Sequence, residues 1–235
     1  IRRPPRSTLD RSAAAADVYK RHSYMVTHAM PDGESKPDTF ILDMRDLIWD
    51  GSSGVELIAP WDGHGMTATQ SHGMAFKNFP ATRLAFPGDE RRAILAGMDR
   101  PQGALFVAVI TGIVEIAVTS ARQQLESKRK SMRSYERAEW ARVEMEAWLV
   151  RQAYEGMLRD VEMGGSSARN SLLAKETIAE LAESILLRIS KVIGGGAYSR
   201  HTPYGFWLED VRALGFLRPP WGLAFERVFE GSWNS

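Results

Sequence analysis

The sequence predicts an α+β fold that is mainly α, with a short antiparallel β segment followed by an antiparallel helical bundle. Up to Pro87, apolar runs are short and are separated by turn-forming residues, which is the pattern of strands and hairpins. Beyond Pro87, apolar residues recur every three or four positions over long stretches, which is the pattern of helices. Glycines at 164–165 and 194–196 divide these stretches, so we expect long antiparallel helices joined by short links.

Residues 22–87 carry the strand pattern, and we predict that they form the C-terminal part of a β domain. The strand candidates lie at 24–26, 40–42, 55–58 and 73–79. The segment 31–37 contains two prolines and a glycine, residues that favour turns, so it predicts a loop between the first two strands.

Residues 88–235 are predicted to form the helical bundle. Pro101 suits the first turn of a helix, which places the first long helix at 101–127. Two further long helices are expected at 134–163 and 168–193, and a shorter one after Pro203. The predicted buried stripe of the third long helix consists of Ile178, Leu181, Ile185, Ile189 and Val192. That of the second consists of Val143, Ala147, Val150, Tyr154, Met157 and Val161.

The first 21 residues are rich in arginine, proline and alanine, and they resemble translated sequencing-adapter sequence. We therefore predict that residues 1–21 are a non-native segment, with a genuine basic arm as the alternative. On the first interpretation the natural protein extends further in the N-terminal direction.

Composition excludes several classes of function. Lysine and arginine number 30 against 29 acidic residues, whereas a nucleic-acid-binding domain usually carries a basic excess, so no nucleic-acid partner is expected. The absence of cysteine excludes disulfides, thiolate metal ligands and a cysteine nucleophile. His64 and His72 have a spacing that matches no metal motif, so they are predicted to be loop or surface histidines, with no metal site.

The most apolar run, residues 104–118, predicts a buried helix and no membrane span. It is shorter than the about 20 residues that a span requires, and Glu115 interrupts it. The first residues contain no apolar segment of the kind found in secretory signals. We therefore expect a cytoplasmic protein.

Two segments carry functional signals. The first is Trp61-Asp62-Gly63-His64-Gly65-Met66-Thr67-Ala68-Thr69-Gln70-Ser71-His72, in which two glycines permit tight turns and the hydroxyls of Thr69 and Ser71 can donate or accept hydrogen bonds. The second is the helix from Ala174-Lys175 that leads into Gly194-Gly195-Gly196-Ala197-Tyr198-Ser199-Arg200, followed by Glu209-Asp210-Val211-Arg212. A glycine run lacks the Cβ atoms that would block the approach of a dinucleotide.

In order and spacing, these segments resemble the C-terminal half of the acyl-CoA dehydrogenase family over roughly residues 22–215. The resemblance implies α,β-dehydrogenation of an acyl-CoA thioester with FAD as cofactor, in a homodimer or homotetramer. It implies that Gly194, Gly195 and Gly196 approach the FAD of a neighbouring subunit. It also implies that Thr69 and Ser71 line the flavin side of the cleft.

The sequence departs from the family pattern at the catalytic base and at the flavin-contacting arginine. Counted without gaps from Pro203, the position of the family's catalytic glutamate falls on Arg218, which cannot abstract a proton. Glu230 is a displaced candidate for the base, and Arg122 is a candidate for the flavin-contacting arginine, although neither matches the family motif cleanly. Thr67 stands where the family often has arginine.

These departures leave two alternatives open. One is a flavin-dependent monooxygenase or a nitroalkane-oxidase-like enzyme on the same scaffold, because a flavin monooxygenase needs no base at that position. The other is a non-catalytic helical interaction module, because fold alone does not determine function.

Overall fold

The computed structural model describes residues 24–29, 33, 38–69, 71–83, 88–163, 168–217 and 219–233. The chain divides into two compact units. The sheet unit comprises Ile1–Trp61 and Gln70–Glu90, and the bundle unit comprises Asp62–Thr69 and Arg91–Ser235. Residues 1–21 and Arg218 lie outside the described residues.

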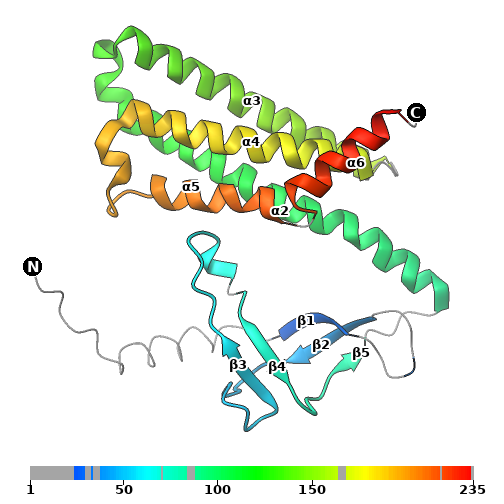
Figure 1. Ribbon diagram of the computed structural model, residues 1–235. Coiled ribbons are helices and arrows are strands. Elements are labelled where there is room, and N and C mark those ends of the chain that lie inside the picture. Colours follow the sequence, from blue (N-terminus) through cyan, green and yellow to red (C-terminus); the bar gives the residue numbers. More distant parts are fainter. Residues whose placement is uncertain are drawn as a thin grey trace, which may run out of the picture. The chain divides into compact units, whose positions relative to one another are not determined.

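The sheet unit contains two small antiparallel sheets (Figure 1). The first has the strand order β1-β2-β5, with β1 at Tyr24–Ala29, β2 at Asp38–Asp43 and β5 at Thr82–Arg83. The second pairs β3 (Val55–Ala59) with β4 (Gly73–Phe76). Short strands in antiparallel hairpins confirm the predicted β segment.

A small apolar core supports these strands. Leu42, Met44 and Val55 are buried, and their partly buried neighbours include Phe40 and Met74. Leu57 on β3 lies opposite Met74 on β4, so the two strands present apolar side chains at matching positions.

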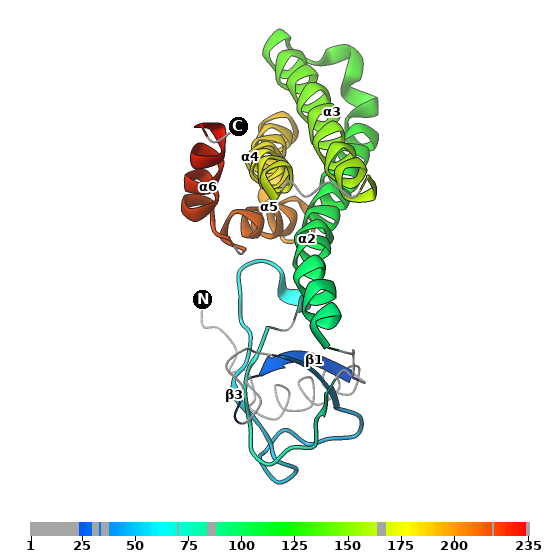
Figure 2. The same cartoon turned by 90° about the vertical axis from the view of Figure 1, so that its right-hand side faces the viewer.

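The bundle unit is built on three long helices (Figures 1 and 2). They are α2 (Gly88–Leu125), which belongs to this unit from Arg91 onward, α3 (Ser134–Glu162) and α4 (Ala168–Ile193). The 3₁₀ helix η2 (Glu126–Ser131) joins the first two. The chain continues through the 3₁₀ helix η3 (Gly194–Tyr198), α5 (Tyr204–Arg212), the 3₁₀ helix η4 (Ala213–Phe216) and α6 (Trp221–Trp233). Long helices joined by short links confirm the predicted helical bundle.

The prediction that the first long helix begins at Pro101 was wrong. In the structure α2 begins at Gly88 and contains Pro101 in its interior. The segment before this proline contains three arginines, two alanines, a glutamate, a leucine and a methionine, which favour helices, so the helical conformation extends back beyond the proline.

The predicted stripe on α4 forms the centre of the core. Ile178, Ile185 and Ile189 are fully buried, which confirms the assignment made from their spacing. They pack in one cluster with residues of α2, α3, α5 and the two 3₁₀ helices that flank α5. On α3 the predicted face is buried at Val143, Val150 and Met157, whereas Val161, in the last turn, is exposed.

Within the described residues, one helical stretch, Phe106–Ser131, has the length and hydropathy that could cross a membrane. A central helix of a bundle meets the same criterion. Val107, Ile110, Val114 and Ala117 on this stretch are buried in the bundle core.

A charged cluster connects α3 to α4. Arg188 on α4 donates from Nη1 to Glu139 Oε2 at 2.6 Å and from Nε to Glu146 Oε1 at 2.8 Å. All three side chains are largely shielded from solvent. The hydrogen bond from Arg188 lowers the pKa of Glu139 below its usual 4.5. One guanidinium therefore binds two carboxylates that approach it from the neighbouring helix, and it offsets the charge of one of them.

Replacing Arg188 with methionine should lower stability at neutral pH and weaken its pH dependence. Because the pKa of Glu139 is lowered in the folded state, its contribution to stability is present above the unfolded pKa and is lost as the pH falls through the folded pKa. This pH dependence can be measured as the urea midpoint of unfolding of both proteins, from neutral pH into the acid range. The stability difference between parent and Arg188→Met should shrink as the pH falls below 4.5, and a constant difference would contradict the assignment.

Candidate functional site

The C-terminal end of α4 forms an open glycine turn. Gly194 has φ +81°, a left-handed conformation that favours glycine. A Cβ atom added at Gly194 or Gly195 would meet no described atom within 4 Å, and one at Gly196 would reach only Ile193 Cγ2 at 3.9 Å. Free space therefore extends directly above the backbone of this turn.

Hydrogen bonds hold the glycine turn in place. The Thr202 hydroxyl lies 3.0 Å from the carbonyl oxygens of both Gly196 and Ser199. The buried Tyr204 hydroxyl donates to Gln124 Oε1 at 2.9 Å, and burial raises the pKa of Tyr204, so it stays a donor. Since Gln124 lies in the last turn of α2, the glycine turn is fixed against the end of that helix.

A cavity of about 350 Å³ lies at this end of α2, within the size range of ligand sites. We call it the end cavity, and it is lined by Arg122, Leu125, Glu126, Arg129, Met132 and Trp140. In Figure 1 the glycine turn and the link between α2 and α3 lie at the same end of the bundle. The turn and the cavity together form the candidate site.

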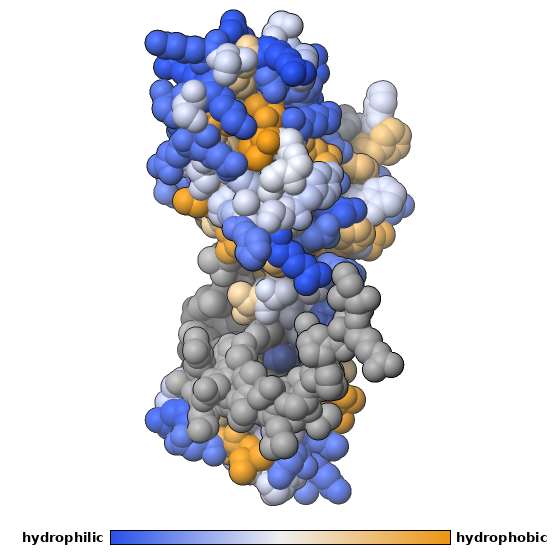
Figure 3. Space-filling model, turned by 90° about the vertical axis from the view of Figure 1, so that its left-hand side faces the viewer, coloured by the Kyte–Doolittle hydropathy of each residue, from blue (hydrophilic) through white to orange (hydrophobic). Residues whose placement is uncertain are grey.

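The charges in the end cavity leave one guanidinium available. Arg129 is exposed, and no described acidic residue forms an ion pair with it. Lys128 and Lys130 flank it in the sequence. Arg129 can therefore form charge-assisted hydrogen bonds with a phosphate. Figure 3 shows the molecule from the end of the bundle that carries the glycine turn. On this unit, hydrophilic side chains surround a narrow hydrophobic strip.

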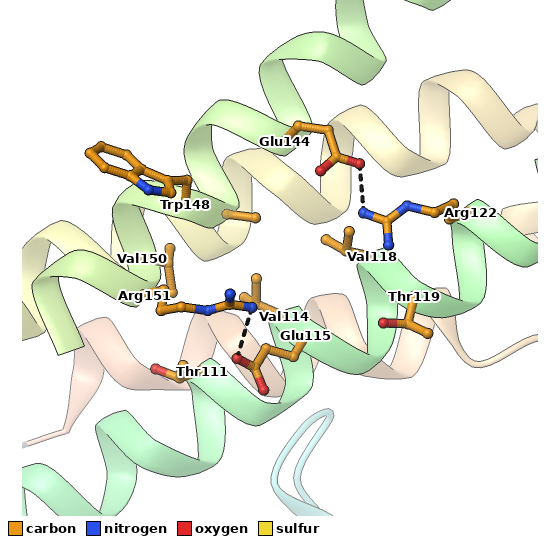
Figure 4. A pocket seen from close by; sticks show the side chains of 11 residues that line it. Thr111, Val114, Glu115, Val118, Thr119, Arg122, Glu144, Trp148, Val150 and Arg151 are labelled. Atoms are coloured by element: carbon orange, nitrogen blue, oxygen red, sulfur yellow. Dashed lines mark hydrogen bonds and ion pairs between the residues drawn. The ribbon is translucent and has the colours of Figure 1, made fainter. Parts of the chain in front are cut away.

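Arg122 lies between the end cavity and a second cavity of about 430 Å³, which falls in the same size range. This side cavity lies between α2 and α3 (Figure 4). Arg122 donates to Glu144 Oε1 at 2.8 Å, and Arg151 pairs with Glu115 at 3.3 Å. Because Arg122 pairs with Glu144 and no described acidic residue pairs with Arg129, Arg129 is the better candidate for binding an anion.

The structure places Thr69 and Ser71 in different units. Thr69 ends the 3₁₀ helix η1 (Thr67–Thr69) in the bundle unit, where its Oγ1 donates to the carbonyl of Met66 at 2.8 Å. Ser71 is an exposed residue of the sheet unit. In that unit, His72 accepts a hydrogen bond at Nδ1 from the backbone N–H of Trp61 at 2.7 Å.

Glu230 lies far from the glycine turn. It is exposed on α6, and it makes no hydrogen bond or ion pair with a described residue. A Cβ on the adjacent Gly231 would lie 3.1 Å from Arg169 Cδ, which places this part of α6 beside the start of α4. The glycine turn follows the other end of α4, about 38 Å away at the rise of 1.5 Å per residue.

Sequence reasoning missed Arg129, Trp140 and the hydrogen bond between Tyr204 and Gln124. The basic run Lys128-Arg129-Lys130 was a usable signal, because three adjacent cations at the end of a helix favour an anion. The other two depend on how α2, α3 and α5 pack, and no local pattern indicates that packing.

No protein-family model matches the chain, and no curated protein matches it. Several solved structures, in contrast, are similar to the chain. KijD3 in complex with FMN and a dTDP-linked amino-keto sugar is 19% identical with a TM-score of 0.73, over 91% of this chain and 56% of that one. Glutaryl-coenzyme A dehydrogenase in complex with glutaryl-CoA is 14% identical with a TM-score of 0.70, over 89% of this chain and 54% of that one. The flavoprotein nitroalkane oxidase is 13% identical with a TM-score of 0.66, over 90% of this chain and 56% of that one.

The chain has the acyl-CoA dehydrogenase fold. It spans about half the length of the solved structures that it matches. At these identities the similarity shows the fold alone. The fold class predicted from the sequence is thereby confirmed.

Proposed function

We propose that this chain is the part of an FAD-dependent oxidoreductase that holds the nucleotide half of the cofactor. The observation that supports the proposal is the open space above Gly194 and Gly195, at the same end of the bundle as a cavity that is lined by Arg129. Glycines allow the cofactor to approach the backbone, and arginine binds phosphate oxygens through charge-assisted hydrogen bonds.

The residues at the end of the bundle fit such a group. Arg129 would bind the pyrophosphate, and the half-buried indole of Trp140 would form an apolar wall. At Gly194, Gly195 and Gly196 the 3₁₀ helix η3 would present its backbone without a side chain. When bound, the flavin would supply hydride acceptance, which the amino-acid side chains cannot provide.

We further propose that the dinucleotide is supplied by a second copy, in a homodimer or homotetramer. The space above the glycines is unfilled by the described residues of a single chain. Thr69 in the bundle unit and Ser71 in the sheet unit are each proposed as residues that contact the flavin.

The proposed reaction is α,β-dehydrogenation of an acyl-CoA thioester. It is supported by the fold shared with a glutaryl-CoA dehydrogenase that was solved with its thioester. Glu230 is the proposed base that would remove the α-proton.

The exposure of Glu230 favours a second candidate function. A general base usually lies in a site shielded from bulk water, and Glu230 lies open to solvent on α6. A monooxygenase-like or nitroalkane-oxidase-like enzyme would not need Glu230 as its base, and the chain shares its fold with KijD3 and nitroalkane oxidase.

Calorimetric titration with FAD, ADP and FMN tests the cofactor proposal. FAD and ADP should bind and FMN should bind more weakly, because only the first two carry the adenosine diphosphate group. Replacing Arg129 with alanine should weaken ADP binding by about ten- to a hundredfold, the value of a charged hydrogen bond. Arg122→Ala is the matched control and should have a smaller effect, because Glu144 neutralises Arg122. Equal affinity for FMN and FAD would contradict the proposal.

Activity assays on protein that binds FAD separate the two candidate reactions. Reduction of a dye with an acyl-CoA substrate, lost in Glu230→Gln, would support the dehydrogenase. Oxygen consumption with supplied reduced flavin, unchanged in Glu230→Gln, would support the monooxygenase-like candidate. A protein that binds no flavin would leave the helical interaction module as the remaining hypothesis.

A further inference from the structure

The loop Asp62–Thr69 lies against α5 with a close backbone contact. A Cβ atom on Gly65 would overlap the carbonyl oxygen and carbon of Glu209. Both backbones belong to the bundle unit. Only glycine can occupy this position without displacing the loop or the helix.

The next residue adds a hydrogen bond at the same place. The backbone N–H of Met66 donates to Asp210 Oδ1 at 2.5 Å, a charge-assisted contact between residues 144 positions apart in the sequence. Met66 has φ +52°, which is unfavourable for a residue with a side chain. Its side chain packs against the bundle core, and its carbonyl accepts from Thr69 N at 3.0 Å. The loop therefore holds a strained conformation that α5 stabilises.

The other end of α5 is fixed to the candidate site. Tyr204, its first residue, bonds to Gln124 beside the end cavity, and Thr202 contacts the glycine turn. Asp210 lies six residues after Tyr204, a rise of about 9 Å. One short helix therefore connects the glycine turn to the loop Asp62–Thr69.

We propose that Asp210 is a positioning residue: its carboxylate, together with the backbone contact at Gly65, docks the loop Asp62–Thr69 on α5. The docking requires no cofactor. The docking holds Thr69 at a defined place in the bundle unit. Any effect of this on flavin binding rests on the proposed function.

Spin labels test the docking directly, because the chain contains no cysteine that would react elsewhere. The substitutions Thr67→Cys in the loop and Phe206→Cys on α5 are at exposed positions, and each accepts one label. Distances between the labels are measured by pulsed electron paramagnetic resonance on the full chain without flavin. The parent should give one narrow distribution, and Asp210→Ala should give a broad one. An Asp210→Ala distribution as narrow as that of the parent would overturn the proposal.

Two variants separate docking from general loss of structure. Asp210→Asn keeps an oxygen that can accept from Met66 N, so it should restore most of the narrow distribution. Asp62→Asn removes a carboxylate from the same loop and should leave the distribution unchanged. Circular dichroism of each variant monitors the helices. If Asp210→Asn behaves like Asp210→Ala, the role assigned to the carboxylate oxygen is wrong.

Proteolysis gives a second measure. Thermolysin cuts before large apolar residues, so cleavage between Gly65 and Met66, followed by mass spectrometry, reports release of the loop. Loss of a hydrogen bond to a charged group should raise this cleavage by about tenfold or more in Asp210→Ala. Gly65→Ala should raise it as well, because the added methyl group overlaps Glu209. Unchanged cleavage in both variants would overturn the docking, whatever the result of the flavin titrations.

Discussion

Replacing Gly195 with leucine should abolish dinucleotide binding and leave the bundle folded. A Cβ at Gly195 meets no described atom within 4 Å, so the new side chain can extend into the open space without displacing the chain. The backbone of Gly195 also has no positive φ that would strain a larger residue. If the cofactor occupies that space, leucine fills the volume that the cofactor requires. We expect ADP affinity to fall by more than about a hundredfold, since several contacts would be lost at once.

Gly222→Leu is the matched control for this substitution. A Cβ atom at Gly222 would also meet no described atom within 4 Å, but Gly222 lies on α6, next to Trp221 and away from the glycine turn. Both variants should show the same unfolding midpoint within a small margin. Calorimetric titration with ADP measures the difference in affinity. Undiminished binding by Gly195→Leu would show that the nucleotide does not lie over the turn.

Replacing Ile185 with alanine should be the most destabilising of the substitutions considered for the bundle. Ile185 is fully buried, and its neighbours Ile178, Leu186 and Ile189 on the same helix are fully buried as well. α4 packs against α3, α5 and α6, so a void at its centre cannot be filled by movement of one partner. Large-to-small changes of this kind cost about 2–5 kcal/mol, and we expect a value in the upper half of that range.

Urea unfolding monitored by circular dichroism measures this cost. Leu187→Ala is the control, because Leu187 is the next residue but one along α4 and is 42% exposed. It should cost less than about 1 kcal/mol, as is usual for exposed positions. Equal destabilisation by the two variants would mean that α4 is not packed as the structure describes.

The helices and their buried faces could be predicted because they depend on local periodicity. Ile178, Ile185 and Ile189 recur at helical spacing, and the same spacing determines which side chains meet in the core. The start of α2 could not be predicted from Pro101. Proline is favoured in the first turn of a helix, but it can also lie inside a helix whose flanking residues favour that structure.

The candidate site could be predicted only in part. Gly194, Gly195 and Gly196 stand out as a run, and the structure leaves space above them, whereas their role in cofactor binding stays a prediction. The contact between Met66 and Asp210 joins residues far apart in the sequence, so it follows from tertiary packing and from no local pattern. For the same reason the sequence offered Arg122 as a candidate cofactor-binding arginine but gave no sign of its ion pair with Glu144 on the facing helix.

The most direct test of the central claim is a nuclear magnetic resonance titration of chain labelled with ¹⁵N-glycine. FAD is added, and the amide signals of Gly194, Gly195 and Gly196 are followed together with those of Gly222 and Gly112, whose surroundings are also open. We predict large shifts for the three glycines of the turn and none for the two controls. Shifts confined to other glycines, or no shifts at saturating FAD, would contradict the account.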